Sequence, residues 1–231
     1  MDKPTTPNAA QLYNATWLNV AGAAARSVIS AAKAIGMVNV PVWMGEGSPD
    51  WKAEESALGR NFTFEFAWLD MLGQMAENGV KRAYRQTVRS VVGGSELPPA
   101  YYMSFLWRTL VLSAKDSVPV RRVVVIGSSS SSVRAYALGD VVILLNTDRW
   151  RLRRVRVKYP GWCRKRREEW HCMGGADVAP GVHGILVNGK QPTFEGGGPR
   201  FARPAVVECE EAIVVGPGAV MFVQASDNFS K

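Results

Sequence analysis

The sequence shows no membrane-spanning stretch and no signal peptide, and it has few histidines and cysteines. No apolar run approaches the roughly 18 residues of a spanning helix, and residues 1–7 are polar and contain two prolines. The chain has two histidines and three cysteines. Cys163, His171 and Cys172 do not have the spacing of a paired zinc motif, and a fourth ligand is not evident, so we expect no metal site.

The three cysteines are an odd number, and all lie in the C-terminal part of the chain. They allow one disulfide with a free thiol or three reduced thiols, and their spacing does not choose between these. Sequons for N-glycosylation begin at Asn14, Asn61 and Asn228, but motifs this short often arise by chance.

Two common catalytic signatures are missing as well. The serine run 128–132 lacks the Gly-x4-Gly-Lys framework of a phosphate loop. His171 and His183 are remote from any Gly-x-Ser-x-Gly elbow, so no serine hydrolase triad is visible.

What the chain does have is an ordinary apolar content and an excess of cations. Its 231 residues are 47% hydrophobic, which is enough for a sizeable core in one large domain or two modest ones. The formal net charge is +8. This balance predicts an anionic partner: nucleic acid, acidic lipid, or a sulfated or uronic-acid glycan.

The first half of the chain alternates between helical and strand patterns. The predicted elements are a helix over 14–35, a strand over 40–44, a helix over 61–78, a strand over 80–88 and a helix over 99–112. The strand 40–44 has the composition of a fully buried strand in a parallel sheet, and the helix 14–35 carries one Ala-rich apolar stripe. The order predicts repeating βα units; because an eight-stranded barrel needs more strands, a barrel would be represented only by its last part.

The composition changes near residue 115. Short β-branched segments separated by Gly, Pro or Asn then follow, which predicts an antiparallel sandwich. We expect strands over 118–126, 133–137, 141–145, 152–157, 184–187, 205–209 and 220–224. The predicted domains are therefore residues 1–114 and residues 115–231.

A single carboxylate follows the first predicted strand. Glu46 lies between Gly45 and Gly47 at the carboxyl end, where barrel enzymes place catalytic groups. If the two predicted strands are parallel neighbours, Arg85 and Gln86 end at the same rim and would keep the carboxylate charged. The plainer alternatives are a solvated Glu46 and an Arg85 that pairs with another nearby acid.

A dense basic run lies in the second half. Ten of the nineteen residues at 149–167 are Arg or Lys, with Trp150 and Trp162 between them. Arg forks bind sulfate and carboxylate groups, so we expect an anionic-glycan contact, although an edge strand kept soluble by its charges is the equal alternative. The predicted contact residues are Arg151, Arg153, Arg154, Arg156 and Lys158. These charged residues have odd numbers up to Arg153 and even numbers from Arg154. Because alternate residues of a strand share a face, one strand could hold all of them on one face only with a bulge at 153–154.

The chain carries six blocks in a characteristic order: residues 42–48, 66–73, 84–87, 99–107, 182–190 and 220–224. The first four, which include Gly45-Glu46 and Arg85-Gln86, resemble in order and spacing the second half of heparanase and the plant-type β-glucuronidases, glycoside hydrolase family 79. The last two resemble the β-sandwich of that family more loosely.

The resemblance implies the C-terminal part of a TIM (β/α)8 barrel followed by an antiparallel β-sandwich, and retaining hydrolysis of β-glucuronides such as heparan sulfate. It implies that Glu46 is the nucleophile, that Arg85 and Gln86 support it, and that no metal or organic cofactor takes part. It also implies an extracellular, lysosomal or membrane-associated protein whose partner is an anionic polysaccharide rather than nucleic acid.

The chain departs from the family in several places. The family's general acid/base is a Glu after an Asn on an earlier barrel strand, but this sequence has no Asn-Glu pair. By resemblance, the first four or five βα units are absent, and a missing N-terminal segment or chain would complete the barrel. The loop 48–52 is bulkier than the family's Gly-rich loop, and Ser95-Glu96-Leu97 stand where the family has a substrate-binding Tyr. The alternatives are a non-catalytic anionic-glycan-binding protein of the same fold and a truncated product that cannot fold alone.

Overall fold

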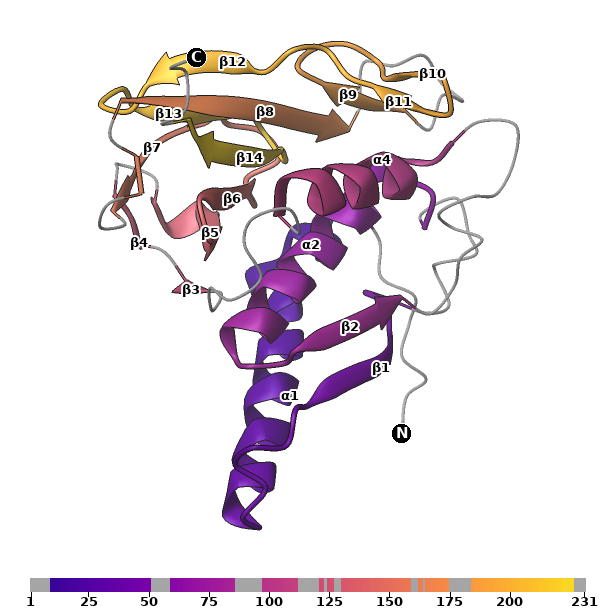
Figure 1. Ribbon diagram of the computed structural model, residues 1–231, viewed down its shortest axis with the longest axis vertical. Coiled ribbons are helices and arrows are strands. Elements are labelled where there is room, and N and C mark those ends of the chain that lie inside the picture. The colour runs from indigo at the N-terminus through magenta and orange to yellow at the C-terminus, as the bar shows by residue number, and fades with distance from the viewer. Residues whose placement is uncertain are drawn as a thin grey trace.

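The computed structural model describes residues 9–50, 59–85, 97–111, 121–122, 124–126, 130–158, 162–163, 165–174 and 184–226. Figure 1 shows helices in the first half of the chain lying against antiparallel sheets formed by the second half. The predicted boundary near residue 115 lies outside the described residues.

The three predicted helices are confirmed. They are α1 (Ala15–Ala34), α2 (Phe62–Glu77) and α4 (Pro99–Leu106), which continues as the π-helical turn η2 (Trp107–Val111); short 3-10 turns, η1 (Gln11–Tyr13) and η3 (Ser130–Ser132), also occur. The side chains of Asn14 and Asn61 begin α1 and α2, since their Oδ1 atoms accept backbone N–H bonds at 2.9 Å from Thr16 and 3.1 Å from Thr63. Two of the three sequons therefore coincide with helix caps.

Two strands of the first half form a small parallel sheet. Strand β1 (Trp43–Gly47) pairs with β2 (Arg82–Arg85) in parallel, so the predicted neighbours are confirmed. The prediction of a fully buried strand is wrong, because Trp43 is 52% exposed and Val40 is 54% exposed. Helix α2 contacts one face of the pair through Glu65 in its first turn and through Met71. In the described part of the chain the other face is uncovered (Figure 1).

The second half forms two antiparallel sheets and a separate hairpin. The larger sheet has seven strands in the order β12-β8-β14-β6-β5-β3, with β9 paired to β8. Its strands are β3 (Arg121–Arg122), β5 (Val133–Leu138), β6 (Val141–Asn146), β8 (Arg166–Gly174), β9 (Ile185–Val187), β12 (Ala205–Glu208) and β14 (Val220–Ala225). The smaller sheet has the order β13-β7-β4, from β4 (Val124–Ile126), β7 (Arg153–Lys158) and β13 (Ile213–Val215). The hairpin joins β10 (Thr193–Glu195) to β11 (Gly198–Arg200).

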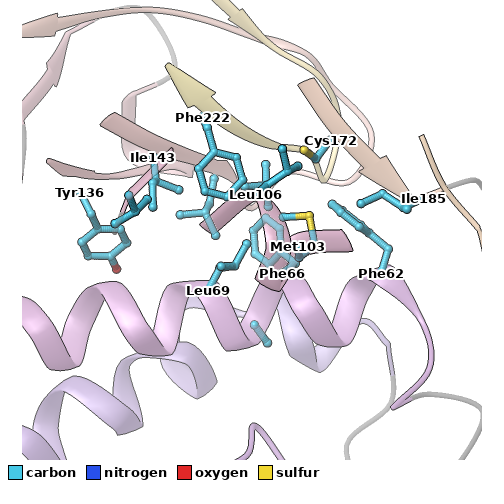
Figure 2. Close-up of a cluster of buried hydrophobic side chains, with 14 of the residues drawn as sticks. Phe62, Phe66, Leu69, Met103, Leu106, Tyr136, Ile143, Cys172, Ile185 and Phe222 are labelled. Atoms are coloured by element: carbon cyan, nitrogen blue, oxygen red, sulfur yellow. The ribbon is translucent and has the colours of Figure 1, made fainter. Parts of the chain in front are cut away.

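Both faces of the seven-stranded sheet are covered over its central strands β5, β6 and β14. One face packs against α2 and α4 through Phe66, Met103 and Phe222, as Figure 2 shows. The other face packs against the smaller sheet through Leu144 on β6 and Val155 on β7. This is why every residue of β5 and β6 is buried, and it means that one apolar core joins residues from both predicted domains.

A buried polar cluster fixes α1 and α2 on this sheet. The Asp70 carboxylate, which is fully buried on α2, accepts hydrogen bonds from Tyr136 Oη at 2.8 Å and Gln74 Nε2 at 2.6 Å, and it pairs with Arg134 at 3.1 Å. Arg134 also donates to Asn19 of α1 at 2.8 Å. Burial, and then the negative charge of Asp70, raise the pKa of Tyr136 well above its usual range, so its hydroxyl stays protonated as a donor.

The apolar stripe predicted for α1 is covered only in its first half. Leu18 and Ala25 are buried, but Val28 is 54% exposed and Ile35 is 72% exposed. Figure 1 shows the reason: the C-terminal end of α1 extends beyond α2 and away from the sheets. Ile29 and Ala32 are half-buried, so full burial along the predicted stripe ends after Ala25.

Candidate functional site

A β-bulge directs the side chain of Glu46. Met44 pairs with Ala83 and Gly47 pairs with Arg85, so two residues, Gly45 and Glu46, lie opposite Tyr84 alone. An extra residue in one strand re-aims the side chains around it, and such bulges are common beside active sites. Here Glu46 is exposed, while a side chain at Gly47 would contact Met71 of α2. Because neighbouring residues of a strand point to opposite faces, we infer that Glu46 lies on the face away from α2.

The uncovered face of the β1–β2 pair also carries aromatic and cationic side chains. Tyr84 is 45% exposed beside the bulge, and Trp43 is 52% exposed at the start of β1. The Arg82 guanidinium carbon lies 4.8 Å from the centroid of the Trp43 ring, to which it is paired across the strands. We call Trp43, Glu46, Arg82 and Tyr84 the open-face cluster. The side chain of Glu46 makes no hydrogen bond or ion pair with any residue that the structure describes.

Arg85 lies on the opposite face and is bound to a different carboxylate. Both of its terminal nitrogens lie 2.7 Å from the two carboxylate oxygens of Glu65 on α2. The pair is buried, and the guanidinium carbon lies 5.6 Å from the ring centroids of both Phe64 and Trp68. The structure thus brings Arg85 to Glu65 and not to Glu46. Gln86 lies outside the described residues.

Part of the basic run forms a cationic surface on the smaller sheet. Arg154, Arg156 and Lys158 are exposed on one face of β7, whereas Arg153, Val155 and Val157 alternate with them toward the inner face. Arg151 is exposed immediately before the strand. We call Arg154, Arg156 and Lys158 the β7 ridge. None of the three makes an ion pair with another described residue.

The structure shows how this run lies in the smaller sheet. Strand β7 stands between β13 and β4 in the strand order, with β13 paired to residues 153–155 and β4 paired to residues 156–158. The predicted residues also do not share one face: without a bulge in β7, Arg153 turns inward and pairs with Asp148.

A second buried charge cluster lies on β8. Arg167 Nε donates to Glu169 Oε1 at 2.8 Å, and His171 Nε2 lies 3.3 Å from Glu169 Oε2. Burial raises the pKa of Glu169, but the hydrogen bonds with His171 and Arg167 outweigh it and hold the pKa below the usual range. Arg167 Nη1 also donates to the carbonyl oxygens of Glu208 and Cys209, which ties β8 to the end of β12. These contacts are structural, because the cluster is largely buried within the sheets.

The structure chooses one of the two predicted cysteine states. Cys163 and Cys209 form a disulfide across 46 residues of sequence, and Cys172 is a buried free thiol whose pKa is raised by burial. Within the described ranges, no three His, Cys, Asp or Glu side chains come together as a metal site. The helices described here are also too short or too polar to span a bilayer.

The sequence patterns did not single out Trp43, Arg82 and Tyr84 as neighbours of Glu46. Their common face could be recognised only once the pairing of residue 44 with 83 and of residue 47 with 85 was known. The bulge itself has a sequence signal, the Gly-Glu-Gly at 45–47, since Gly in a strand often marks a bulge.

Comparison with known proteins gives weak structural likenesses, among them those to two glycoside hydrolases. No protein-family model matches the chain, and no curated protein matches its sequence. A solved glycoside hydrolase family 5 protein from Bacteroides vulgatus is similar with a TM-score of 0.35 and 9% identity, covering 71% of this chain and 37% of that one. Another solved glycoside hydrolase is similar with a TM-score of 0.34 and 11% identity, over the same shares of the two chains. The chain thus spans 37% of the length of either structure, and TM-scores of this size do not establish a shared fold.

Proposed function

We propose that the chain is part of a retaining glycoside hydrolase that acts on β-glucuronides, with Glu46 as its nucleophile. The observation that carries this proposal is the bulge opposite Tyr84, which leaves the Glu46 carboxylate exposed on a parallel strand pair and without a hydrogen-bond or ion-pair partner among the described residues. The resemblance of blocks 42–48 and 84–87 to glycoside hydrolase family 79 points to the same residue.

The chemistry needs a second carboxyl group. In a retaining enzyme the nucleophile attacks the anomeric carbon and forms a glycosyl-enzyme, while an acid about 5–5.5 Å away protonates the leaving oxygen and later activates water. We assign no residue of this chain to the acid. A further chain segment or a partner chain that completes the barrel is proposed to supply it.

The open-face cluster suits an acidic sugar. Exposed aromatic rings such as Tyr84 and Trp43 offer apolar faces to a sugar ring, and Arg82 offers a guanidinium that can bind a uronic carboxylate. We therefore propose a uronic-acid glycan, such as heparan sulfate, as the substrate class.

We also propose that the protein works outside the reducing cytosol, in an extracellular, lysosomal or membrane-associated setting. The disulfide between Cys163 and Cys209 supports this proposal, because disulfides persist in oxidising compartments and are rare in cytosolic proteins.

A second candidate is a non-catalytic protein that binds anionic glycans. The exposed β7 ridge, whose cations make no ion pair among the described residues, favours it. So does the pairing of Arg85 with Glu65, which leaves Glu46 without that cation. Arg forks bind sulfate and carboxylate groups in pairs of hydrogen bonds, so the ridge with Arg151 could hold such a polymer without cleaving it.

Hydrolysis of a chromogenic β-glucuronide separates the two candidates. With a dinitrophenyl leaving group, which needs little protonation, a hydrolase chain that lacks the acid should still release a burst of chromophore as Glu46 is glycosylated. Glu46→Gln should abolish this release, and Glu195→Gln, at an exposed position in the hairpin, should leave it unchanged. Salt-sensitive retention on heparin with no release by any variant would support the binding protein instead.

A further inference from the structure

The loop between β6 and β7 holds apolar side chains out in solvent. Trp150 is 82% exposed, the highest value among the large hydrophobic residues of the described chain, and Leu152 is 58% exposed. Single exposed hydrophobic residues are common, but a tryptophan and a leucine displayed next to each other on one loop are not explained by folding.

Buried hydrogen bonds hold this loop in place. Asn146, which is fully buried, donates from Nδ2 to the carbonyl oxygens of Arg151 and Gly216, both at 2.8 Å. Asp148 Oδ1 accepts from the backbone N–H groups of Trp150 at 2.9 Å and Arg151 at 3.1 Å. The backbone at Trp150 and Arg151 is therefore held by these hydrogen bonds, and in this conformation the Trp150 side chain lies in solvent.

The loop continues directly into the β7 ridge. Leu152, Arg154, Arg156 and Lys158 are all exposed at alternate positions. The cross-strand partners of Arg154 and Arg156 are apolar and also exposed: Val214 is 36% exposed and Ile126 is 52% exposed. Cationic and apolar side chains thus alternate over one surface, which we call the loop–ridge surface.

We propose that the loop–ridge surface docks on an anionic lipid bilayer. Lys and Arg near such a surface are attracted by acidic headgroups, and Trp and Leu gain by entering the boundary between headgroups and acyl chains. The cations of the β7 ridge alone would fit any polyanion. The aliphatic side chains of Leu152, Ile126 and Val214 favour a bilayer, because a soluble anionic polysaccharide has no apolar interior in which to bury them. This inference does not depend on the chemistry of Glu46.

Sedimentation with vesicles tests the proposal. The probes are phosphatidylcholine vesicles with and without phosphatidylserine, and the chain is expected to bind only those with phosphatidylserine. Because each cation near an anionic surface contributes about a fivefold gain in affinity, the double variant Arg154→Gln and Arg156→Gln should bind roughly 25-fold more weakly. The double variant Trp150→Ser with Leu152→Ser should lose at least about tenfold in affinity for these vesicles. All four side chains are exposed, so these variants keep the fold.

The matched control is Arg26→Gln with Lys33→Gln, which removes the same charge from the exposed surface of α1 and should bind like the parent chain. Equal binding by the control pair and the ridge pair would overturn the proposal, because net charge alone would then explain binding. So would unchanged vesicle binding by the Trp150 and Leu152 variant. Binding to heparin but not to either vesicle would assign the surface to a glycan instead.

Discussion

Neighbouring residues of the β1–β2 pair take opposite roles. Gly47 and Arg85 face α2, where Glu65 completes a buried ion pair, while Glu46 and Tyr84 face away from it. Breaking such a buried pair by removing one partner leaves an uncompensated charge, so Arg85 acts on the placement of β2 rather than on the carboxylate of Glu46. The plainer expectation for Arg85, a pair with a nearby acid, is the one observed.

The Glu169 cluster makes stability depend on pH. The pKa of Glu169 is lowered in the folded chain. The contribution of its carboxylate to folding stability is therefore fully present above the unfolded pKa of about 4.3, and it is lost as pH falls through the folded pKa. We predict that Glu169→Gln destabilises the protein by about 3 kcal/mol at neutral pH, because Arg167 is then buried without its charge partner. Urea unfolding at neutral pH and at a pH below the folded pKa of Glu169 should show this difference shrinking, because the parent carboxyl is then protonated as well.

The same exposed-site control, Glu195→Gln, should change the unfolding free energy by about 0.5 kcal/mol at most. A Glu169→Gln difference of the same size at both pH values would contradict the role of the charge.

At the scale of elements, α2 and β5 make a close helix–sheet contact at Gly73. A Cβ atom built at Gly73 would lie 2.5–2.6 Å from the ring of Tyr136, and that ring cannot move aside because its hydroxyl is bound to Asp70. Gly73 is therefore required at this position by packing, although it stands inside a helix where Gly is ordinarily unfavourable.

We predict that Gly73→Ala destabilises the protein by about 1–3 kcal/mol, because overpacking outweighs the gain of about 1 kcal/mol that Ala brings to a helix. Chemical denaturation measures the change. The control is Gly45→Ala, where no atom lies within 4 Å of the added Cβ. An increase in stability on Gly73→Ala would show that the contact can relax.

The disulfide joins the segment after β7 to the end of β12. A link across 46 residues is expected to stabilise the folded chain by about 4 kcal/mol, because it restricts the unfolded chain. We predict that Cys163→Ser with Cys209→Ser lowers the unfolding free energy by about this amount, and that a reductant then has no further effect. An unchanged unfolding midpoint would mean that the link does not form in solution.

Sequence patterns predicted the helices well, because their periodicity and their Asn caps are local. They did not predict that β7 is central, since its partners β4 and β13 come from segments about thirty residues before it and sixty after it. They also predicted burial for 40–44 from its composition, but burial depends on what covers a strand and not on the strand alone. The position of Glu46 at the end of a strand could be predicted from the residues next to it. The face on which its side chain lies could not, because it depends on the register between β1 and β2.

At the scale of the whole molecule, the chain behaves as one packed unit across the predicted domain boundary. Phe62, Phe66 and Leu69 of α2 share a core with Ile143 and Phe222 of the sheet (Figure 2). Neither part could bury these side chains alone, so separation of residues 1–114 from 115–231 would expose both faces.

We predict a single cooperative unfolding transition. Far-UV circular dichroism, which follows helices and strands, and tryptophan fluorescence should give coincident urea curves. Two separated transitions would instead support independent folding of the two predicted domains.

The most direct test of the nucleophile uses an activated 2-deoxy-2-fluoro-β-glucuronyl fluoride. Its leaving group needs little protonation, so the label can form without the acid that this chain is not assigned, and the 2-fluoro group slows release of the covalent intermediate. Intact-mass analysis and peptide mapping should find one glycosyl adduct on Glu46 and none in Glu46→Gln. No adduct on the parent chain, or an adduct that persists in Glu46→Gln, would contradict the account.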